Sequence, residues 1–374
     1  MTARAAFPKT DVFVIGGGPV GLAVAIAARR RGLRVTLADA LEPPIDKACG
    51  EGIMPDGLEA AARLGVQLPS ATSFKFRGIR FHGAGVSVAA DFPANSGRGI
   101  RRTALHHALV EQAERCGVDL RWGCSVPGLE GIEAHWIVGA DGTNSRVRGW
   151  ARLDACRRDT RRYGFRLHFQ RSPWTEYVEI YWGDGCQIYV TPVAADEVGV
   201  ALLSRDPKLR VREALAQFPA LAAKLSDAPE SSGERGAITA SRQLKRVTRS
   251  VGGVNIALIG DASGSVDAIS GEGICLGFHQ ALALADAMES RDLSMYELAH
   301  RRLSVRPRFM AGLMLTIDKR HWLRKRVFPA LAAYPDLFGG LLAMHVGAAR
   351  KIDFAADCVA LGWRILTISE PFGT

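Results

Sequence analysis

Residues 11–21 read DVFVIGGGPVG, and this stretch decides the fold of the 374-residue chain. The apolar run Val12–Ile15 is typical of a short buried strand, and the Ala-rich residues that follow Gly21 are typical of a helix. A second short strand, Val35–Leu37, leads to Asp39. Strand, glycine-rich turn, helix and strand form a βαβ unit, which predicts a parallel sheet in an α/β fold.

The spacing of the glycines in this turn is the one that binds dinucleotides. Gly16 permits the tight turn, Gly18 lets backbone amides approach a pyrophosphate, and Gly21 allows close packing of helix on strand. The helix N-terminus adds partial positive charge, and Pro19 lies in the same turn. Asp39 stands where a ribose hydroxyl needs an acceptor. This context favours a dinucleotide site over a plain tight turn.

Two later segments distinguish FAD from NAD, since both bind to such a turn. Residues 139–148 read GADGTNSRVR, and residues 259–264 read IGDASG, followed by GEGI at 271–274. An Asp after a buried strand can accept a hydrogen bond from a ribityl or ribose hydroxyl, and the positive end of a helix can face the pyrimidine edge of a flavin. The sequence therefore predicts FAD, bound by the turn and by Asp39, Asp141, Gly142, Gly260, Asp261, Gly271, Glu272, Gly273 and Ile274.

At these motifs the chain resembles the flavoprotein superfamily that contains p-hydroxybenzoate hydroxylase, the flavin-dependent halogenases and the geranylgeranyl reductases. The resemblance spans about residues 11–290 and includes Arg102, in an R-x-x-L pattern where the family has a flavin-contacting arginine. It implies a doubly wound FAD-binding domain of the Rossmann-like, glutathione reductase type. In the hydroxylases the segment that matches Asp141-Gly142 is associated with NAD(P)H as well as FAD, so NAD(P)H is the expected reductant.

The branch of the superfamily stays open on the motifs. KACGEG at 47–52 is similar to the Lys-x-Cys-Gly segment of geranylgeranyl reductases, and GEGI at 271–274 also matches that branch. GEGIMP at 50–55 resembles a halogenase-like monooxygenase motif, but the W-x-W-x-I-P motif of halogenases is absent. With YVTP at 189–192, the pattern looks most like short bacterial hydroxylases of phenolic or polyketide-derived compounds.

Three functions follow as hypotheses. The favoured one is an FAD-dependent monooxygenase that hydroxylates a hydrophobic small molecule with NAD(P)H and O₂. The first alternative is a reductase of isoprenoid C=C bonds, and the second is a flavoprotein without catalysis. Cys49, Glu51 and Tyr189 are the candidate catalytic residues, and Cys49 and Gly50 are also expected beside the flavin. A packed thiol, a loop-shaping carboxylate and sheet packing are the respective alternatives.

The texture of the sequence predicts how the domains are arranged. Alternating strands from about residue 155 suit an antiparallel substrate domain inserted into the nucleotide-binding sheet. The predicted FAD-binding domain comprises 1–72, 97–154 and 251–300, and the substrate domain comprises 73–96 and 155–250. Residues 301–374 are expected to form a helical section.

Composition restricts the partners and the cellular location. The net charge is +10, but no basic stretch has the interleaved aromatics of a nucleic-acid platform. The seven cysteines form no C-x-x-C pair, so no metal site or disulfide framework is indicated, and free thiols suit the cytoplasm. Residues 319–326 are basic around Trp322, which is either a solvated helix face, the favoured interpretation, or a membrane-surface contact. No motif predicts the oligomeric state.

Overall fold

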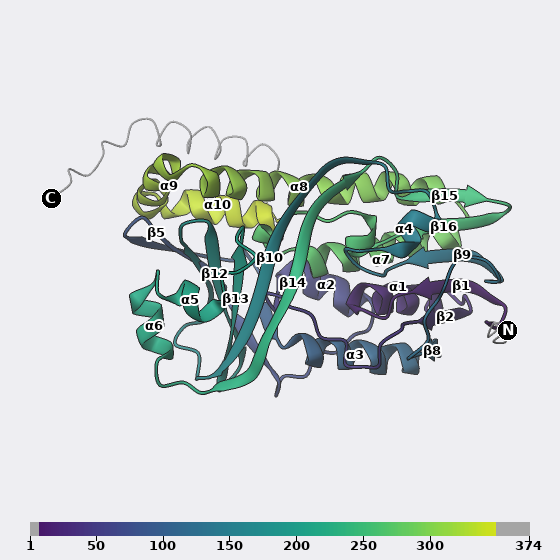
Figure 1. Cartoon of the computed structure of the whole chain (residues 1–374), viewed down its shortest axis with the longest axis horizontal. Helices are drawn as coiled ribbons and strands as arrows, with labels where there is room; N and C mark the ends of the chain where they lie inside the picture. Colours follow the sequence, from purple (N-terminus) through teal and green to yellow (C-terminus); the bar gives the residue numbers. More distant parts are fainter. Residues whose placement is uncertain (1–6, 349–374) are drawn as a thin grey trace.

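The computed structural model describes residues 7–348, together with the backbone but not the side chains of 157–160. Two sheets lie at opposite ends of an elongated molecule, and a layer of C-terminal helices runs along one side (Figure 1). The first sheet is mainly parallel and the second mainly antiparallel. The predicted α/β fold with a Rossmann-like FAD-binding domain, an antiparallel sheet and C-terminal helices is confirmed.

The first sheet is built around the strand that opens the sequence motif. β1 is fully buried at Val12, Phe13 and Val14, and it pairs in parallel with β2 on one side and β9 on the other. The order of this six-stranded sheet is β15 (Thr248–Val251), β16 (Val254–Leu258), β9 (Ala134–Gly139), β1 (Thr10–Ile15), β2 (Val35–Ala38) and β8 (Asp119–Arg121). Parallel pairing brings the ends of β1, β9 and β16 to one edge, which is where ligands bind in such sheets.

Helices cover the first sheet and connect it to the rest of the molecule. α1 is buried along nearly its whole length and packs against α7 and α3. The helices are α1 (Pro19–Arg29), α2 (Pro55–Arg63), α3 (Arg102–Arg115), α4 (Arg146–Trp150), α5 (Val211–Leu215), α6 (Pro219–Leu225), α7 (Gly273–Glu289), α8 (Leu293–Lys319), α9 (His321–Ala333) and α10 (Pro335–His345). Two short 3₁₀ turns, η1 (Gly260–Ser263) and η2 (Ala268–Ser270), follow β16.

The second sheet has seven strands and contains two long neighbouring strands that cross the molecule (Figure 1). Its order is β14 (Glu230–Leu244), β10 (Cys156–Gln170), β13 (Glu197–Ser204), β12 (Cys186–Ala194), β11 (Tyr177–Trp182), β5 (Gly78–Gly83) and β6 (Val86–Asp91). A smaller sheet consists of β3 (Gly52–Ile53), β7 (Gly97–Ile100) and β4 (Ser73–Phe76).

The domain boundaries remain a prediction, and strand pairing follows them only approximately. β4 begins the segment assigned to the substrate domain, yet it pairs with β7 in the small sheet. β15 lies before the predicted boundary at 251, yet it pairs with β16 in the first sheet. Strand pairing crosses both boundaries because a strand joins whichever sheet buries its apolar face.

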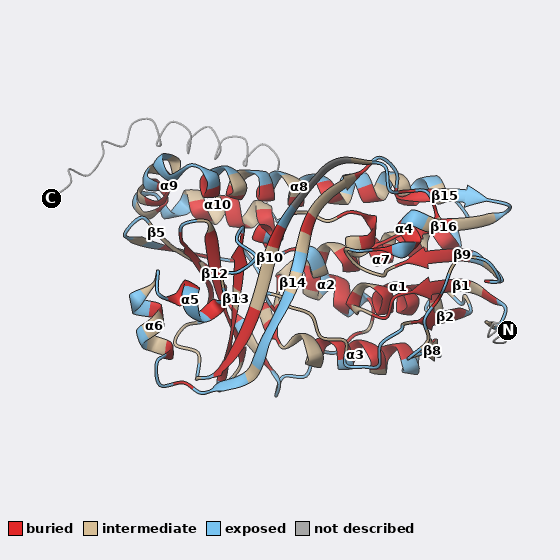
Figure 2. Cartoon of the chain, viewed as in Figure 1, coloured by how far each residue is buried: buried red, intermediate tan, exposed pale blue. Residues whose placement is uncertain are grey.

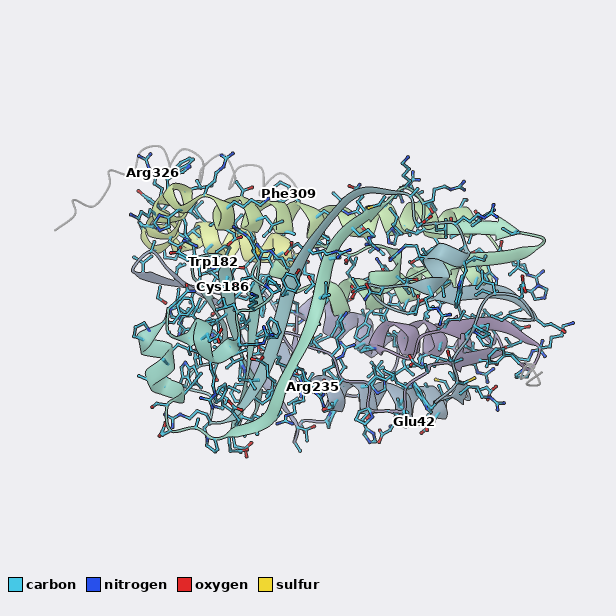
Figure 3. All side chains as sticks on the ribbon, viewed as in Figure 1. Glu42, Trp182, Cys186, Arg235, Phe309 and Arg326 are labelled. Carbon is cyan, nitrogen blue, oxygen red and sulfur yellow. The ribbon has the colours of Figure 1, made fainter. Side chains whose placement is uncertain are left out.

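The C-terminal helices pack on the antiparallel sheet. α9 and α10 contact β6, and Phe328 of α9 packs edge-on against Trp182 of β11. The inner faces of these helices are buried and their outer faces exposed (Figure 2). Figure 3 shows Trp182 beneath the helices, while Phe309 and Arg326 lie on their outer side.

The basic segment 319–326 lies at the junction of α8 and α9. Trp322 is 57% exposed and Lys319, Arg320 and Lys325 are exposed, so a membrane-surface contact stays a prediction. Arg324, counted in this basic face, instead points inward and donates to the Gly183 carbonyl at 2.7 Å. In the described part of the chain no single helix is both long and apolar enough to span a membrane; α9 and α10 meet that test only jointly, with a 103° bend between them.

Candidate functional site

The glycine-rich turn adopts the geometry that its sequence predicts. Gly16 has φ +114°, and a Cβ there would lie 2.4 Å from the Ala140 carbonyl oxygen. A Cβ on Gly21 would lie 1.9 Å from the Gly16 carbonyl oxygen, so this glycine is required for the contact between α1 and β1. Gly18 has no atom within 4 Å of such a position, which leaves its backbone open to a bound group.

Asp39 closes the turn from the end of β2. Its carboxylate accepts hydrogen bonds from the backbone N–H of Gly17 at 2.6 Å and of Leu41 at 2.8 Å. The aspartate therefore connects the glycine turn to the loop after β2, and it lines the same cavity as Gly16 and Gly18. This position agrees with the ribose-binding role expected of it.

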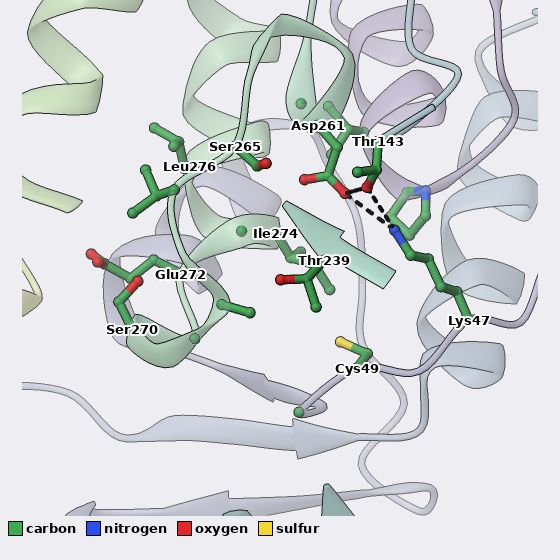
Figure 4. Close-up of a pocket in the computed structure, with 18 of the residues that line it drawn as sticks. Lys47, Cys49, Thr143, Thr239, Asp261, Ser265, Ser270, Glu272, Ile274 and Leu276 are labelled. Carbon is green, nitrogen blue, oxygen red and sulfur yellow. Dashed lines mark hydrogen bonds and ion pairs between the residues drawn. The ribbon is translucent and has the colours of Figure 1, made fainter. Parts of the chain in front are cut away.

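The two later motifs meet on the opposite side of this cavity. Asp261 accepts from Lys47 Nζ at 3.2 Å and from Thr143 Oγ1 at 3.1 Å, so the 47–52 loop, the 139–148 segment and η1 converge (Figure 4). Burial opposes the ionisation of Asp261, but Lys47 and Thr143 outweigh it and hold the pKa of this carboxyl below its ordinary value. Asp141 begins α4, and its Oδ2 accepts from Arg146 N and Val147 N.

One cavity of about 660 Å³ collects the predicted site residues from all these segments. With the exception of Gly21, which packs behind the turn, each of them lines it: Gly16, Gly18, Pro19, Asp39, Cys49, Gly50, Glu51, Arg102, Asp141, Gly142, Tyr189, Gly260, Asp261, Gly271, Glu272, Gly273 and Ile274.

The residues around the cavity fit FAD. Arg102 Nε and Asp141 Oδ1 are buried there without a hydrogen-bond partner among the described residues, as expected of a donor and an acceptor that await a ligand. The open backbone at Gly18 and the N-terminus of α1 suit a pyrophosphate. Gly271 and Gly273 likewise leave open space before α7, which suits the edge of a flat ring.

Comparison with known proteins identifies the cofactor domain. Residues 9–131 match the family model described as an FAD binding domain. The chain is an FAD-dependent oxidoreductase. This assignment confirms the expected superfamily and cofactor.

Relatives of this oxidoreductase include two kinds of reductase. It is 28% identical over 320 residues to a menaquinone reductase of Mycobacterium tuberculosis, which covers 76% of the chain and 78% of the relative. It is 26% identical over 324 residues to a digeranylgeranylglycerophospholipid reductase of Methanothrix thermoacetophila, with 76% and 80% covered.

The fold is shared with solved flavoproteins of several chemistries. A flavoprotein/dehydrogenase of Cytophaga hutchinsonii superimposes with a TM-score of 0.77 at 18% identity, covering 90% of this chain and 92% of that one. Other structures with this fold include an oxygenase, a halogenase and a geranylgeranyl reductase-like protein. At such identity the likeness establishes the fold alone.

In this oxidoreductase the 47–52 loop contributes a thiol and a carboxylate of different character. Cys49 is half-buried and lines the cavity. Glu51 is 3% exposed, and its carboxylate accepts from Arg166 Nη1 at 2.8 Å and lies 2.7 Å from His168 Nε2. With Arg102 N as a further donor at 2.8 Å, this carboxylate is arranged to hold the loop on β10. The catalytic role of either residue remains a prediction.

Tyr189 lies on β12 at the wall of the cavity. Its hydroxyl donates to the Ile269 carbonyl at 2.8 Å, and burial raises the pKa of the phenol above its ordinary value. A neutral phenol that is committed to a backbone acceptor supports η2, which precedes the GEGI segment.

Beyond the FAD-binding segments the cavity continues into an apolar space, here called the chamber. One wall is formed by apolar residues of β5 and β11, among them Ile79, Phe81 and Ile180. The other wall comes from α8, α9 and α10, and includes Met310, Met314, Ile317, Leu331, Phe338 and Leu342. The chamber gives the oxidoreductase space for an apolar molecule beside its cofactor.

Sequence reasoning missed the residues that build the chamber and those that link the loops. Lys47 stood inside a quoted motif, and its pairing with Asp261 could not be read from residues far apart in the chain. His345 lines the cavity from α10, and an isolated histidine near the end of the described chain gave no signal. Helical periodicity in residues 293–345 marked a buried face without showing that part of it borders a cavity.

Proposed function

We propose that this flavoprotein reduces a C=C bond of an isoprenoid or similar long apolar substrate. The apolar chamber that continues from the FAD-binding segments is the observation that carries this proposal. An extended apolar space suits a hydrocarbon chain, whereas a phenol would require a compact cavity with convergent polar groups. The names of the two relatives, both reductases, support the same choice.

The proposed chemistry needs one hydride and one proton for each double bond. Bound FAD supplies hydride chemistry, with NAD(P)H as the proposed source of the two electrons. The turn residues, Asp39 and Arg102 bind the cofactor, and the chamber walls exclude water from the reacting carbons. The Cys49 thiol holds the proton at Sγ, transfers it to the carbon that does not receive the hydride, and regains a proton from water.

Anaerobic turnover tests this proposal. FAD-loaded protein in detergent micelles, reduced with dithionite and supplied with a naphthoquinone that carries a four-isoprene chain, should yield a product that has gained two hydrogens by mass spectrometry. Cys49→Ser should retain FAD and lose the reaction by roughly 100-fold, as expected for removal of a proton donor. Cys116→Ser, at the end of α3 and outside the cavity, is the matched control.

Oxygen dependence decides between this function and the hydroxylation favoured on the sequence. A product that forms only in air, and that contains one atom from labelled O₂, would establish a monooxygenase and overturn the reductase proposal. Reduction under anaerobic conditions would do the reverse.

A further inference from the structure

Two buried polar side chains interrupt the apolar lining beside the chamber. Glu272, at the start of α7, and His345, at the end of α10, both line the cavity and are 4% and 5% exposed. His345 Nδ1 lies 3.6 Å from Glu272 Oε2, and neither atom has a hydrogen-bond partner among the described residues. The ring nitrogen Nε2 of His345 likewise bonds to none of them.

The other polar groups near the chamber are already engaged. Tyr189 donates to the Ile269 carbonyl, and Thr191 Oγ1 donates to the Gly50 carbonyl at 2.7 Å. Asp267 Oδ1 accepts from Ile269 N at 3.1 Å. Buried polar groups are normally paired, so the free hydrogen-bonding capacity of Glu272 and His345 points to a ligand.

The charges around this pair come from three helices. Arg306 of α8 lies 3.9 Å from Glu272 Oε1 but pairs more closely with Asp56 of α2, at 2.6 Å. His279 of α7 also faces Asp56, at 3.7 Å. Burial is the main cause that raises the pKa of Glu272, against the effects of His345 and Arg306. Because Asp56 neutralises Arg306, the pair retains a proton between Glu272 and His345.

Basic side chains line the cavity only on the FAD-binding segments. Among the described lining residues these are Lys47, Arg102 and Arg146, and none comes from α8, α9 or α10. A phosphate in the chamber would therefore meet the Glu272 carboxyl without a compensating cation beside it. A neutral carbonyl oxygen could accept a hydrogen bond from His345 there at no such cost.

We propose that His345, oriented by Glu272, binds the carbonyl oxygen of a quinone-type head group, so that the chamber takes a neutral-headed isoprenoid and rejects a phosphorylated one. This inference rests on the proposed function and names the substrate class for the same site. His345 acts here as a specificity residue, and Glu272 positions it.

Binding of matched probes tests the inference without turnover. Calorimetry on FAD-loaded protein would compare three ligands with the same four-isoprene chain: a naphthoquinone, the corresponding naphthalene without oxygen, and the chain monophosphate. Wild type should bind the quinone about tenfold more tightly than the naphthalene, the magnitude of one buried hydrogen bond. The monophosphate should bind more weakly than both.

Substitutions then assign the preference to His345. His345→Leu should abolish the preference for quinone over naphthalene, and His345→Gln, which retains an N–H donor, should restore part of it. His107→Leu makes the same change at a side chain that is 75% exposed on α3, and it should leave all three affinities unchanged. FAD content, measured by absorbance, monitors folding of each variant.

The failure of this inference is distinguishable from failure of the proposed function. Equal binding of quinone and monophosphate, or an unchanged preference in His345→Leu, would overturn the head-group assignment while anaerobic C=C reduction still stood. Loss of anaerobic reduction with an intact His345-dependent preference would overturn the reductase and leave the quinone-binding site.

Discussion

Asp39 shows how a single carboxylate organises the cofactor site. It accepts hydrogen bonds from Gly17 and Leu41, and so holds two loops that line the cavity. Asp39→Ala removes both acceptors, and we expect FAD affinity to fall by about tenfold to a hundredfold, from one or two lost hydrogen bonds. Calorimetric titration of apoprotein with FAD measures this change. Unchanged FAD affinity would show that Asp39 serves the loops alone.

Glu179 is a buried carboxylate with an unusual number of donors. Its side chain is 1% exposed, and Arg80, Trp174 and Tyr181 all donate to it. Burial opposes its ionisation, but hydrogen bonds from His82, Trp174 and Tyr181 lower the pKa from 4.5 to about 2. The folded state therefore gains stability from this group above the ordinary pKa, and loses it as pH falls from about 4.5 towards 2.

The replacement Glu179→Gln tests that pH dependence. We expect it to lower the free energy of unfolding by roughly 2–4 kcal/mol at pH 7, because charged donors lose their acceptor. The difference from wild type should shrink as pH falls below about 4.5, as measured by urea unfolding at several pH values. A difference that stays constant down to pH 3 would contradict the assigned cause.

At the scale of elements, the end of α8 is fixed to the antiparallel sheet by a buried acidic residue. Asp318 accepts from Arg162 Nη2 of β10 at 2.5 Å and from Gln187 Nε2 of β12 at 2.5 Å, and Arg205 also donates to it. Arg162 is itself 4% exposed. This junction holds the helices that wall the chamber against the sheet opposite.

Asp318→Asn should loosen that junction, since it leaves the Arg162 charge buried without its partner. We expect a loss of roughly 3–5 kcal/mol in the free energy of unfolding and faster hydrogen exchange in α8 to α10. Asp336→Asn, at an exposed site near the start of α10, is the control. Exchange rates equal to wild type throughout the three helices would refute the role of Asp318.

At the scale of the whole molecule, the chamber exists because elements remote in sequence meet. β5 precedes α8 by more than two hundred residues, yet both contribute to the same cavity. Arg166 and His168 of β10 reach Glu51 from the inserted sheet and hold the 47–52 loop in place. Cofactor segments and chamber walls thus depend on one packing of two sheets and the C-terminal helices.

The sequence by itself determined the α/β fold and FAD, because a phosphate-binding turn is local. Gly16, Gly18 and Gly21 must be contiguous with a strand and a helix, so their spacing carries the information. Only the tertiary structure decided the walls of the chamber and the meeting of Glu272 with His345. An apolar helix face has the same periodicity whether it packs on a sheet or borders a cavity, and a long-range pair leaves no mark on either local sequence.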